Sequence, residues 1–309
     1  MISFCRQSAD HQQHMLLFGS GLIGSAIHNV IRRAPAWRAT PIDWKWDDPP
    51  RRQRVAAQIE TDVRGSERID IVWAAGISGF ASTDADMAAE SAHVAEIAGL
   101  AQKLAARGHQ IVFHLFSSLG GIHEGQRAIG PQSVVATRRP YGRGKLTQES
   151  LIEKLGSAGT IIPRIYRPSS VFGYARAGRR GLFATMIASM LSYRPIEIYG
   201  SVHTLRDYVF APDIGVFVVE SLDRPPTPAL EFIASGKPTS VTEAITVLEQ
   251  LLDRRAFCRY SSAPHNMLDM TVHRAAIPAS LPRTPLLIGV ASVLQNMSRS
   301  VICQPYEPR

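Results

Sequence analysis

The first half of the chain alternates short apolar runs with stretches of helical periodicity, and this alternation restricts the fold more than any other feature. The predicted strands are 15–18, 38–43, 69–75, 110–117 and 160–167. The predicted helices are one that ends near residue 33, followed by 51–62, 84–107 and 138–155. Strands that alternate with helices are typical of a parallel sheet covered on both faces. We therefore predict an α/β fold with a Rossmann-like, doubly wound parallel sheet.

The second half of the chain has a different character. Beyond Pro168 glycine, proline and arginine become more frequent and the apolar runs become shorter. We expect a dinucleotide-binding domain over 15–170 and a smaller α/β substrate lobe over 171–309, with segments near 205–235 returning to the main sheet. No uncharged apolar run reaches the roughly 18 residues that a membrane span needs. The best candidate, 285–294, is expected to be a buried helix instead.

The first fourteen residues, MISFCRQSADHQQH, lack the apolar core of a secretory signal. We expect 1–14 to be a polar, mobile extension, with Met15 as an alternative start. The three cysteines, Cys5, Cys258 and Cys303, lie far apart, which fits neither a disulfide framework nor a zinc site. A cytoplasmic location is the default expectation.

The chain carries a formal charge of +8, from 34 basic and 26 acidic residues. Its basic residues are spread out and form no dense stripe with interleaved aromatics, so we expect no nucleic-acid partner. A surplus of this kind suits phosphate-bearing small molecules. Histidine pairs occur at His11 and His14 and at His109 and His114, and His123 precedes an acid. No three-ligand cluster emerges, and we expect no metal.

A glycine motif, G-x-G-x-x-G, follows the first predicted strand and opens the first helix. Its glycines are Gly19, Gly21 and Gly24, with Leu22 and Ile23 between the last two. Glycines permit a tight turn and a close backbone approach, and the amides at a helix start can bind a pyrophosphate. The motif predicts a dinucleotide site.

Asp43 lies 19 residues after Gly24, at the end of the second predicted strand. A carboxylate there can bind a ribose diol, which favours NAD. Lys45, Arg51 and Arg52 could equally meet a 2′-phosphate, and a solvated turn acid is the structural alternative. We expect NAD, with NADP as the open alternative.

Tyr141 and Lys145 form the second motif, YGRGK, inside the helix predicted over 138–155. At a spacing of four residues the two side chains share one helix face. A phenol, with a pKa of about 10, is a poor acid–base group at neutral pH, and a nearby ammonium stabilises its ionised form. Ser118 ends the preceding strand and could hold a substrate oxygen, with Ser117 as the fallback. Parallel strands would bring these residues to one edge of the sheet.

At this point the chain resembles the extended short-chain dehydrogenases/reductases, the NAD-dependent epimerase/dehydratase group that acts on nucleotide sugars. The resemblance runs from about Met15 to the final helix. Its motifs are FGSGLIG at 18–24, Ala74-Ala75-Gly76, FSS at 116–118, YGRGK at 141–145, RPSSVFG at 167–173, and Arg206-Asp207-Tyr208 followed by Asp213. The resemblance implies an NAD(P)-dependent enzyme, a nucleoside-diphosphate sugar as ligand and a homodimer formed through the helices near 84–107 and 138–155.

Carried over residue by residue, the resemblance implies Tyr141 as the acid–base residue, Lys145 as its tuner and ribose ligand, and Ser118 as the substrate-orienting hydroxyl. Ala74, Ala75 and Gly76 would line the cofactor. Arg206 would contact the substrate diphosphate, and its structural alternative is a salt bridge with Asp207 or Asp213. Ser170 stands where many members have the substrate-contacting asparagine.

Two further departures bear on the reaction. No asparagine occurs between Asn29 and Asn266, so the family's mid-helix asparagine near Ala92 is missing. Leu119-Gly120 replaces the Asp-Glu pair of the sugar dehydratases, which argues against water elimination. The expected activity is therefore that of a 4-epimerase or a 4-ketoreductase. A catalytically silent nucleotide-binding protein and a reductase of a non-nucleotide ketone are the alternatives.

Overall fold

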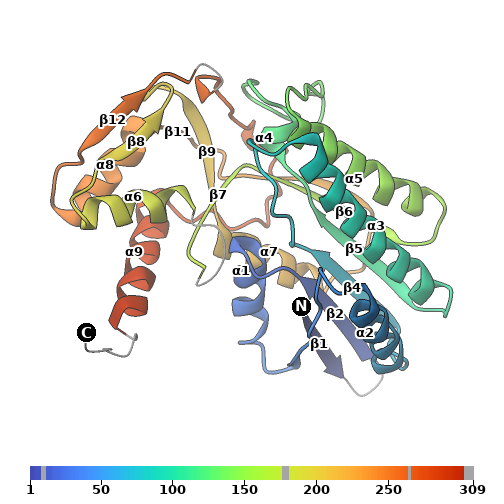
Figure 1. Cartoon of the computed structure of the whole chain (residues 1–309). Coiled ribbons are helices and arrows are strands. Elements are labelled where there is room, and N and C mark those ends of the chain that lie inside the picture. The colour runs from blue at the N-terminus through green and yellow to red at the C-terminus, as the bar shows by residue number, and fades with distance from the viewer. Residues whose placement is uncertain (8–11, 176–180, 264–265, 303–309) are drawn as a thin grey trace.

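A seven-stranded sheet, in the order β10-β6-β5-β4-β2-β1-β3, forms the centre of the larger part of the molecule (Figure 1). The structure is a computed structural model, and it describes residues 1–7, 12–175, 181–263 and 266–302. The strands are β1 (Ile2–Gln7), β2 (Gln12–Phe18), β3 (Trp37–Pro41), β4 (Arg68–Trp73), β5 (Gln110–Phe116), β6 (Ile162–Pro168) and β10 (Ala229–Ile233). The pairs β2–β4, β4–β5, β5–β6 and β6–β10 are parallel.

Helices cover both faces of this sheet, as Figure 1 shows. One face packs on α1 (Leu22–Ile31) and α7 (Ala211–Ser221), and the other packs on α2 (Pro49–Asp62), α3 (Asp84–Ala105) and α5 (Pro140–Ser157). Alternate residues of β2 enter the two cores: Met15 and Leu17 lie on the first face, and Leu16 and Phe18 on the second. This period of two, with both faces buried, explains why the strands are continuous apolar runs.

The predicted fold class is confirmed: the molecule is α/β with a mostly parallel, Rossmann-like sheet. Local signals explain several boundaries. Asp48 caps α2 by accepting a hydrogen bond from the Arg51 amide, and prolines occupy the first turn. Thr83 and Asp86 form a reciprocal capping box at the start of α3.

The expectation of a mobile extension over 1–14 is wrong for the described residues of that range, 1–7 and 12–14. Residues Ile2–Gln7 form β1, which runs antiparallel to both β2 and β3 and lies between them. Phe4 of this strand is fully buried, and the Arg6 guanidinium lies 4.8 Å from the centroid of the Trp37 ring. Backbone hydrogen bonds to β2 and β3 hold this strand in place. The sequence shows little sign of them, because the segment contains few apolar residues.

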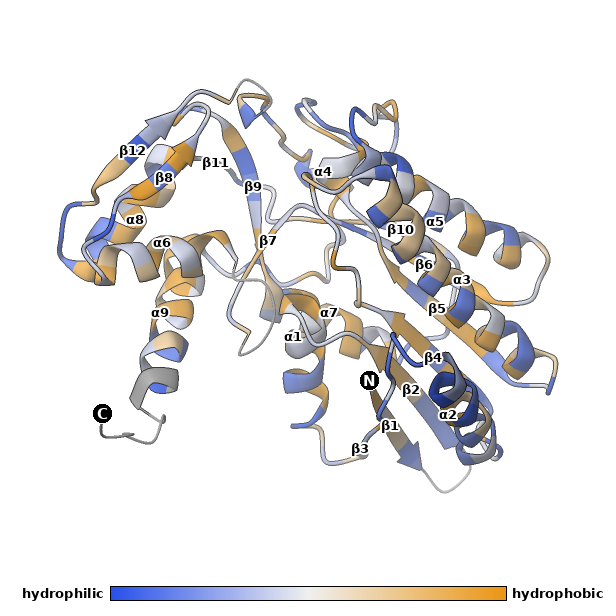
Figure 2. Cartoon of the chain, viewed as in Figure 1, coloured by the Kyte–Doolittle hydropathy of each residue, from blue (hydrophilic) through white to orange (hydrophobic). Residues whose placement is uncertain are grey.

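A smaller lobe follows the main sheet. It contains a three-stranded sheet of β7 (Ser170–Phe172), β9 (Leu205–Phe210) and β11 (Pro238–Ser240), and a pair formed by β8 (Ile196–Tyr199) and β12 (Cys258–Ser261). Its helices are α6 (Leu182–Leu191), α8 (Val241–Leu252) and α9 (Leu286–Ile302), and Figure 2 shows apolar residues along α6 and the inner part of α9. Of the segments near 205–235, β10 joins the main sheet, whereas β9 belongs to the smaller one. In the described part of the chain no helix is long and apolar enough to cross a membrane.

Candidate functional site

The glycine loop and the segment after β4 meet at the carboxyl edge of the main sheet. Gly19 has a φ of +109°, and a Cβ built there would lie 2.2 Å from the Ala74 carbonyl oxygen. A Cβ on Gly24 would lie 2.2 Å from the Gly19 carbonyl oxygen. Side chains are therefore excluded at both positions. Gly21 is the N-cap of α1 and makes no side-chain cap, so the first-turn amides, including those of Leu22 and Ile23, face this edge. Gly19, Gly24 and Ala74 thus form a cradle that fits a pyrophosphate.

Tyr141 and Lys145 lie on the same face of α5, with the lysine Nζ 5.8 Å from the centroid of the tyrosine ring. The glycines of YGRGK bring this helix close to its neighbours. A Cβ on Gly142 would lie 2.0 Å from the carbonyl oxygen of Gly121, in α4 (Leu119–Ile122), and a Cβ on Gly144 would lie 2.4 Å from the Met87 side chain of α3. The motif therefore places the phenol and the ammonium where three elements meet.

Ser118 and Ser117 both lie at this edge, at the end of β5. The Ser118 hydroxyl caps α4 by accepting a hydrogen bond from the Gly121 amide at 3.0 Å. Tyr141 packs directly on Gly121, since a Cβ there would lie 2.9 Å from the ring. The Ser117 hydroxyl is buried and has no hydrogen-bond partner within the described residues. Gly121 thus contacts both Ser118 and Tyr141, and the two side chains lie at the same edge of the sheet.

Lys145 makes an ion pair that the sequence does not reveal. Its Nζ lies 2.7 Å from Oε1 of Glu90 on α3, and both side chains are almost fully buried. Burial alone would raise the pKa of the Glu90 carboxyl, but the Lys145 charge and several hydrogen bonds lower it to about 2. The Glu90 carboxyl is therefore ionised at neutral pH.

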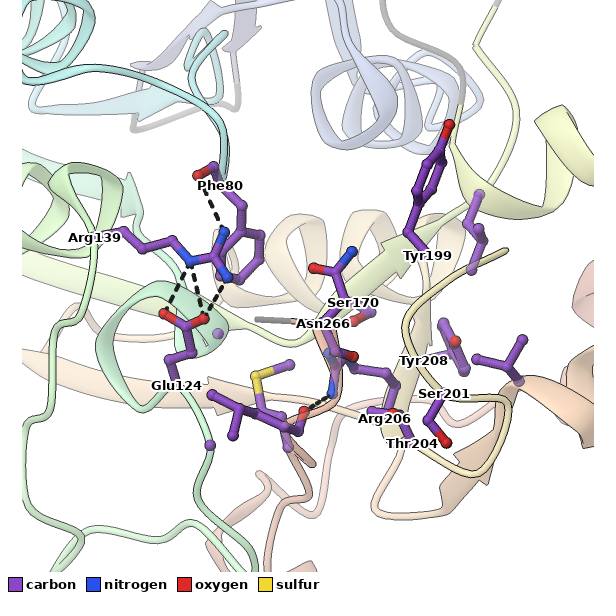
Figure 3. A pocket seen from close by; sticks show the side chains of 16 residues that line it. Phe80, Glu124, Arg139, Ser170, Tyr199, Ser201, Thr204, Arg206, Tyr208 and Asn266 are labelled. Atoms are coloured by element: carbon purple, nitrogen blue, oxygen red, sulfur yellow. Dashed lines mark hydrogen bonds and ion pairs between the residues drawn. The ribbon is translucent and has the colours of Figure 1, made fainter. Parts of the chain in front are cut away.

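A cavity of about 240 Å³ lies between the main sheet and the smaller lobe (Figure 3). Phe80 and Gly120 line the end near Tyr141, and the Phe80 and Tyr141 ring centroids are 5.7 Å apart. Ser170 and Arg206, both predicted to bind substrate, line the cavity as well. It thus connects the neighbourhood of the phenol with the residues expected to bind a diphosphate.

Arg206 does not form the salt bridge that is its structural alternative. Its guanidinium donates to the backbone carbonyls of Leu268 and Asn266, and burial lowers its pKa. Asp207 accepts hydrogen bonds from the Ser235 and Gly236 amides, and Asp213 accepts them from Thr284. Backbone carbonyls hold the Arg206 guanidinium, and the charges of Asp269 and Glu124 stabilise it as well.

Asp43 follows a strand that does not pair with the strand leading into the glycine loop, although the ring of the next residue, Trp44, contacts the last residue of β2. The strand before Asp43 is β3, and β1 lies between β3 and the strand β2 that leads into Gly19. Neighbouring strands are about 4.8 Å apart, so the end of β3 lies farther from β2 by about that distance than it would if the two strands were adjacent. The Asp43 carboxylate pairs with Arg51 and lies 3.7 Å from the Lys45 ammonium.

Ala75 lies at a second cavity, of about 420 Å³, that Ile77, Ser78, Glu90, His93 and Trp46 also line. The Trp46 and His93 rings have centroids 4.5 Å apart. Gly76 follows at the same loop, and a Cβ there would lie 3.2 Å from the Lys145 Nζ. The segment 74–76 therefore connects the glycine loop with α5.

The described residues hold no group of three or more His, Cys, Asp or Glu side chains arranged for a metal. His14 and His109 both contact Ser66, whereas His11 and Cys303 lie outside the described residues.

Sequence reasoning missed Glu90, Phe80 and the pair formed by Glu124 and Arg139 on the cavity wall. Arg139 Nη2 lies 2.7 Å from Glu124 Oε1, and Figure 3 shows the pair facing the cavity opposite Arg206. A signal for Glu90 was present: it interrupts the apolar stripe of α3 that includes Met87, Val94 and Ile97. A charge on such a stripe indicates a buried partner.

Residues 16–229 match the model of the NAD dependent epimerase/dehydratase family. Among solved structures, RMD from Pseudomonas aeruginosa complexed with NADPH has 18% identity and a TM-score of 0.76, over 93% of this chain and 99% of that one. UDP-glucose 4-epimerase from Thermus thermophilus, complexed with NAD, has 15% identity and a TM-score of 0.74, over 92% and 98%. MoeE5, in complex with UDP-glucuronic acid and NAD, has 19% identity and a TM-score of 0.73, over 93% and 99%. No curated protein sequence matches the chain.

Proposed function

Because the chain belongs to the NAD dependent epimerase/dehydratase family, we propose that it is an NAD(P)-dependent enzyme acting by hydride transfer on a nucleoside-diphosphate sugar. One observation carries this proposal: the cavity that Arg206 lines also reaches Phe80, whose ring centroid lies 5.7 Å from that of Tyr141. A substrate with its diphosphate at Arg206 would then extend its sugar toward the phenol. The solved neighbours that were crystallised with NAD, NADPH or UDP-sugars support the same class.

The cofactor would lie on the cradle built by Gly19, Gly24 and Ala74, with its pyrophosphate at the start of α1. When bound, the nicotinamide accepts or returns a hydride at the sugar carbon. Lys145 would hold the nicotinamide ribose, because its ammonium lies beside Gly76 at the end of the same cradle.

Tyr141 would move the proton. In the oxidative direction its phenolate oxygen takes the proton of the sugar hydroxyl, and in the reductive direction the phenol returns it. Ser118 would hold the same oxygen, since its hydroxyl lies at the start of the short helix on which Tyr141 packs. The ammonium of Lys145 supports the ionised phenol through space.

Arg206 and Ser170 would position the substrate. A guanidinium presents a planar fork of donors, which suits the paired oxygens of a diphosphate. Ser118 is followed by Leu119 and Gly120, and neither of these residues can act as the acid or the base that water elimination needs. The proposed reactions are 4-epimerisation and 4-ketoreduction. We also propose a homodimer in the cytoplasm, with no nucleic-acid partner.

A product assay separates the two reactions. Purified protein is incubated with UDP-, GDP-, dTDP- and ADP-sugars and their 4-keto forms, with NAD(H) or NADP(H), and products are resolved by anion-exchange chromatography and mass spectrometry. A stereoisomer formed without net cofactor consumption identifies an epimerase, and stoichiometric loss of NAD(P)H on a keto-sugar identifies a reductase. No change across the panel would contradict the proposed function and favour the silent or non-nucleotide alternatives.

A further inference from the structure

Glu90 lies on α3 where two other segments meet it. One is α5, the catalytic helix of the proposed function, and the other is the loop over 74–78 after β4, here called the cofactor loop. Its neighbours on the same face of α3, Met87, Val94 and Ile97, belong to the buried core. Glu90 itself is 4% exposed and Lys145 is 3% exposed. A carboxylate in such a place is costly unless it is paired and hydrogen-bonded.

The two carboxylate oxygens of Glu90 have different partners. Oε1 accepts from the Lys145 ammonium at 2.7 Å and from the Gln148 amide at 3.1 Å, both on α5. Oε2 accepts from the backbone amides of Ile77 and Ser78 at 3.0 and 2.9 Å. These amides follow Gly76 in the loop after β4. One side chain therefore joins the catalytic helix to the cofactor loop.

Gly76 leaves room for this arrangement. A Cβ built on Gly76 would lie 3.1 Å from Glu90 Oε1 and 3.2 Å from Lys145 Nζ, which is tighter than ordinary contact. The ion pair thus fills the space beside the cofactor loop, and Glu90 also borders the second cavity together with Ala75.

The ion pair changes what Lys145 offers to Tyr141. A lone buried ammonium 5.8 Å from the ring would act on the phenol with its full charge. With the Glu90 carboxylate 2.7 Å from the same ammonium, the opposite charge reduces that field at the phenol without removing the support that Lys145 gives.

We infer that Glu90 is a positioning residue of this enzyme, one that holds Lys145 against the cofactor loop and offsets its charge at Tyr141. This inference rests on the proposed function for the roles of Tyr141 and Lys145. It assigns Glu90 no contact with substrate. Its effect on the chemistry passes through the lysine and through the amides of Ile77 and Ser78.

The test compares Glu90→Gln with Glu96→Gln. Glutamine keeps the size of Glu90 and an acceptor for Lys145 but removes the negative charge. Glu96 lies on the same helix, is partly exposed and pairs with Arg52 on α2, so its variant removes an equal charge away from the site. Ionisation of Tyr141 is followed by ultraviolet absorbance against pH, as the difference between each protein and the same protein carrying Tyr141→Phe. The acidic midpoint of kcat/KM is followed alongside.

Glu90→Gln is expected to move the Tyr141 titration to lower pH by roughly one unit, since an uncompensated ammonium favours the phenolate. The acidic midpoint of kcat/KM should move in the same direction, and Glu96→Gln should move neither. An unchanged titration in Glu90→Gln, or an equal shift in both variants, would overturn the inference. The absorbance titration needs no substrate, so a failure of the proposed function leaves its outcome readable.

A second comparison covers the case in which Glu90→Gln does not fold. The single variant Glu90→Leu leaves Lys145 as a buried, uncompensated cation, and the double variant Glu90→Leu with Lys145→Met removes both charges. The single variant is expected to lose most of its folded fraction in urea at concentrations that the double variant withstands. If Lys145→Met changes the urea midpoint by the same amount in the wild type as in Glu90→Leu, the two residues are not coupled, which would also overturn the inference.

Discussion

At the residue scale, the two side chains that are proposed to carry the chemistry depend on neighbouring glycines, which have no side chain. Gly142 and Gly144 let α5 approach α4 and α3, and any side chain at either position would overlap atoms of those elements. The spacing of Tyr141 and Lys145 predicts a shared face, but the glycines between them decide where that face lies. An exposed Y-x-x-x-K pair without such contacts would remain an ordinary surface feature.

Arg206 offers a prediction at the same scale. Arg206→Ala is expected to raise the KM for a nucleotide sugar by roughly 10- to 100-fold, because a charged hydrogen bond to the diphosphate contributes about 1.5–3 kcal/mol. Cofactor affinity should change little. Steady-state kinetics measure the first quantity, and titration of the cofactor by fluorescence measures the second. Arg255→Ala is the matched control, since Arg255 is mostly exposed and pairs with Glu249, away from the cavity that Arg206 lines. A KM that Arg206→Ala leaves unchanged would show that the diphosphate lies elsewhere.

The identity of the residues around Lys145 could not be predicted from spacing. The pattern of α3 predicts which positions are buried, and position 90 is one of them. Which cation meets the acid depends on how α3 packs on α5, and that packing is a tertiary property. The missing asparagine near Ala92 was visible in the sequence, whereas the carboxylate that reaches the lysine from position 90 was not.

At the element scale, a buried polar network crosses the main sheet. Asp70 on β4, His114 on β5 and Tyr166 on β6 are fully buried, with His114 Nε2 2.9 Å from Asp70 and Nδ1 2.8 Å from the Tyr166 hydroxyl. A neutral imidazole satisfies both contacts, donating to the carboxylate and accepting from the phenol. Burial lowers the pKa of His114 and raises that of Tyr166, which agrees with this arrangement.

This network predicts acid sensitivity. The folded state keeps His114 neutral, whereas the unfolded chain takes up a proton below about pH 6.5, so stability is present above that pH and falls as the pH drops below it. His114→Phe should lower the free energy of unfolding by about 2 kcal/mol at pH 8 and make its decline between pH 6.5 and 5 shallower. Urea denaturation at several pH values measures both effects, with His203→Asn as the exposed control. A decline as steep as in the wild type would contradict this role of His114.

The inserted strand β1 leads to a prediction about cofactor choice. Because β1 separates β3 from β2, the strand end that Asp43 follows lies one strand farther from β2, and the Asp43 carboxylate already pairs with Arg51 and lies 3.7 Å from the Lys45 ammonium. Asp43→Asn is therefore expected to change the ratio of NAD to NADP affinity by less than about threefold, far below the loss of a charged hydrogen bond. Calorimetric titration with both cofactors provides the measurement. A change of tenfold or more would show that the ribose reaches Asp43.

The predicted elements of the main sheet agree with the structure because a buried parallel strand is a continuous apolar run and its helices are capped by local signals. The strand β1 escaped prediction because its order comes from backbone pairing with β2 and β3, and Phe4 is its main apolar contact. The strand that separates Asp43's strand, β3, from β2 could not be predicted either, since the order of strands in a sheet is not a local property.

At the scale of the whole molecule, the two lobes contribute different parts of one site. The main sheet presents the glycine cradle, Tyr141 and Lys145, and the smaller lobe presents Arg206 across the cavity. The cavity is lined from both sides, so binding and chemistry depend on the lobes being joined. This division agrees with the proposed function, in which one lobe carries the hydride transfer and the other selects the substrate.

The most direct test of this account is the Tyr141→Phe variant, measured with the nucleotide sugar that the wild-type protein converts. Loss of the phenol hydroxyl removes the proton acceptor and leaves the cradle intact, so we predict that turnover falls by at least about a hundredfold. The dissociation constant of the cofactor should stay within about twofold of the wild-type value, because one hydroxyl outside the cradle contributes little to it. Product formation is followed by mass spectrometry and cofactor binding by fluorescence. Full turnover in Tyr141→Phe would contradict the central claim.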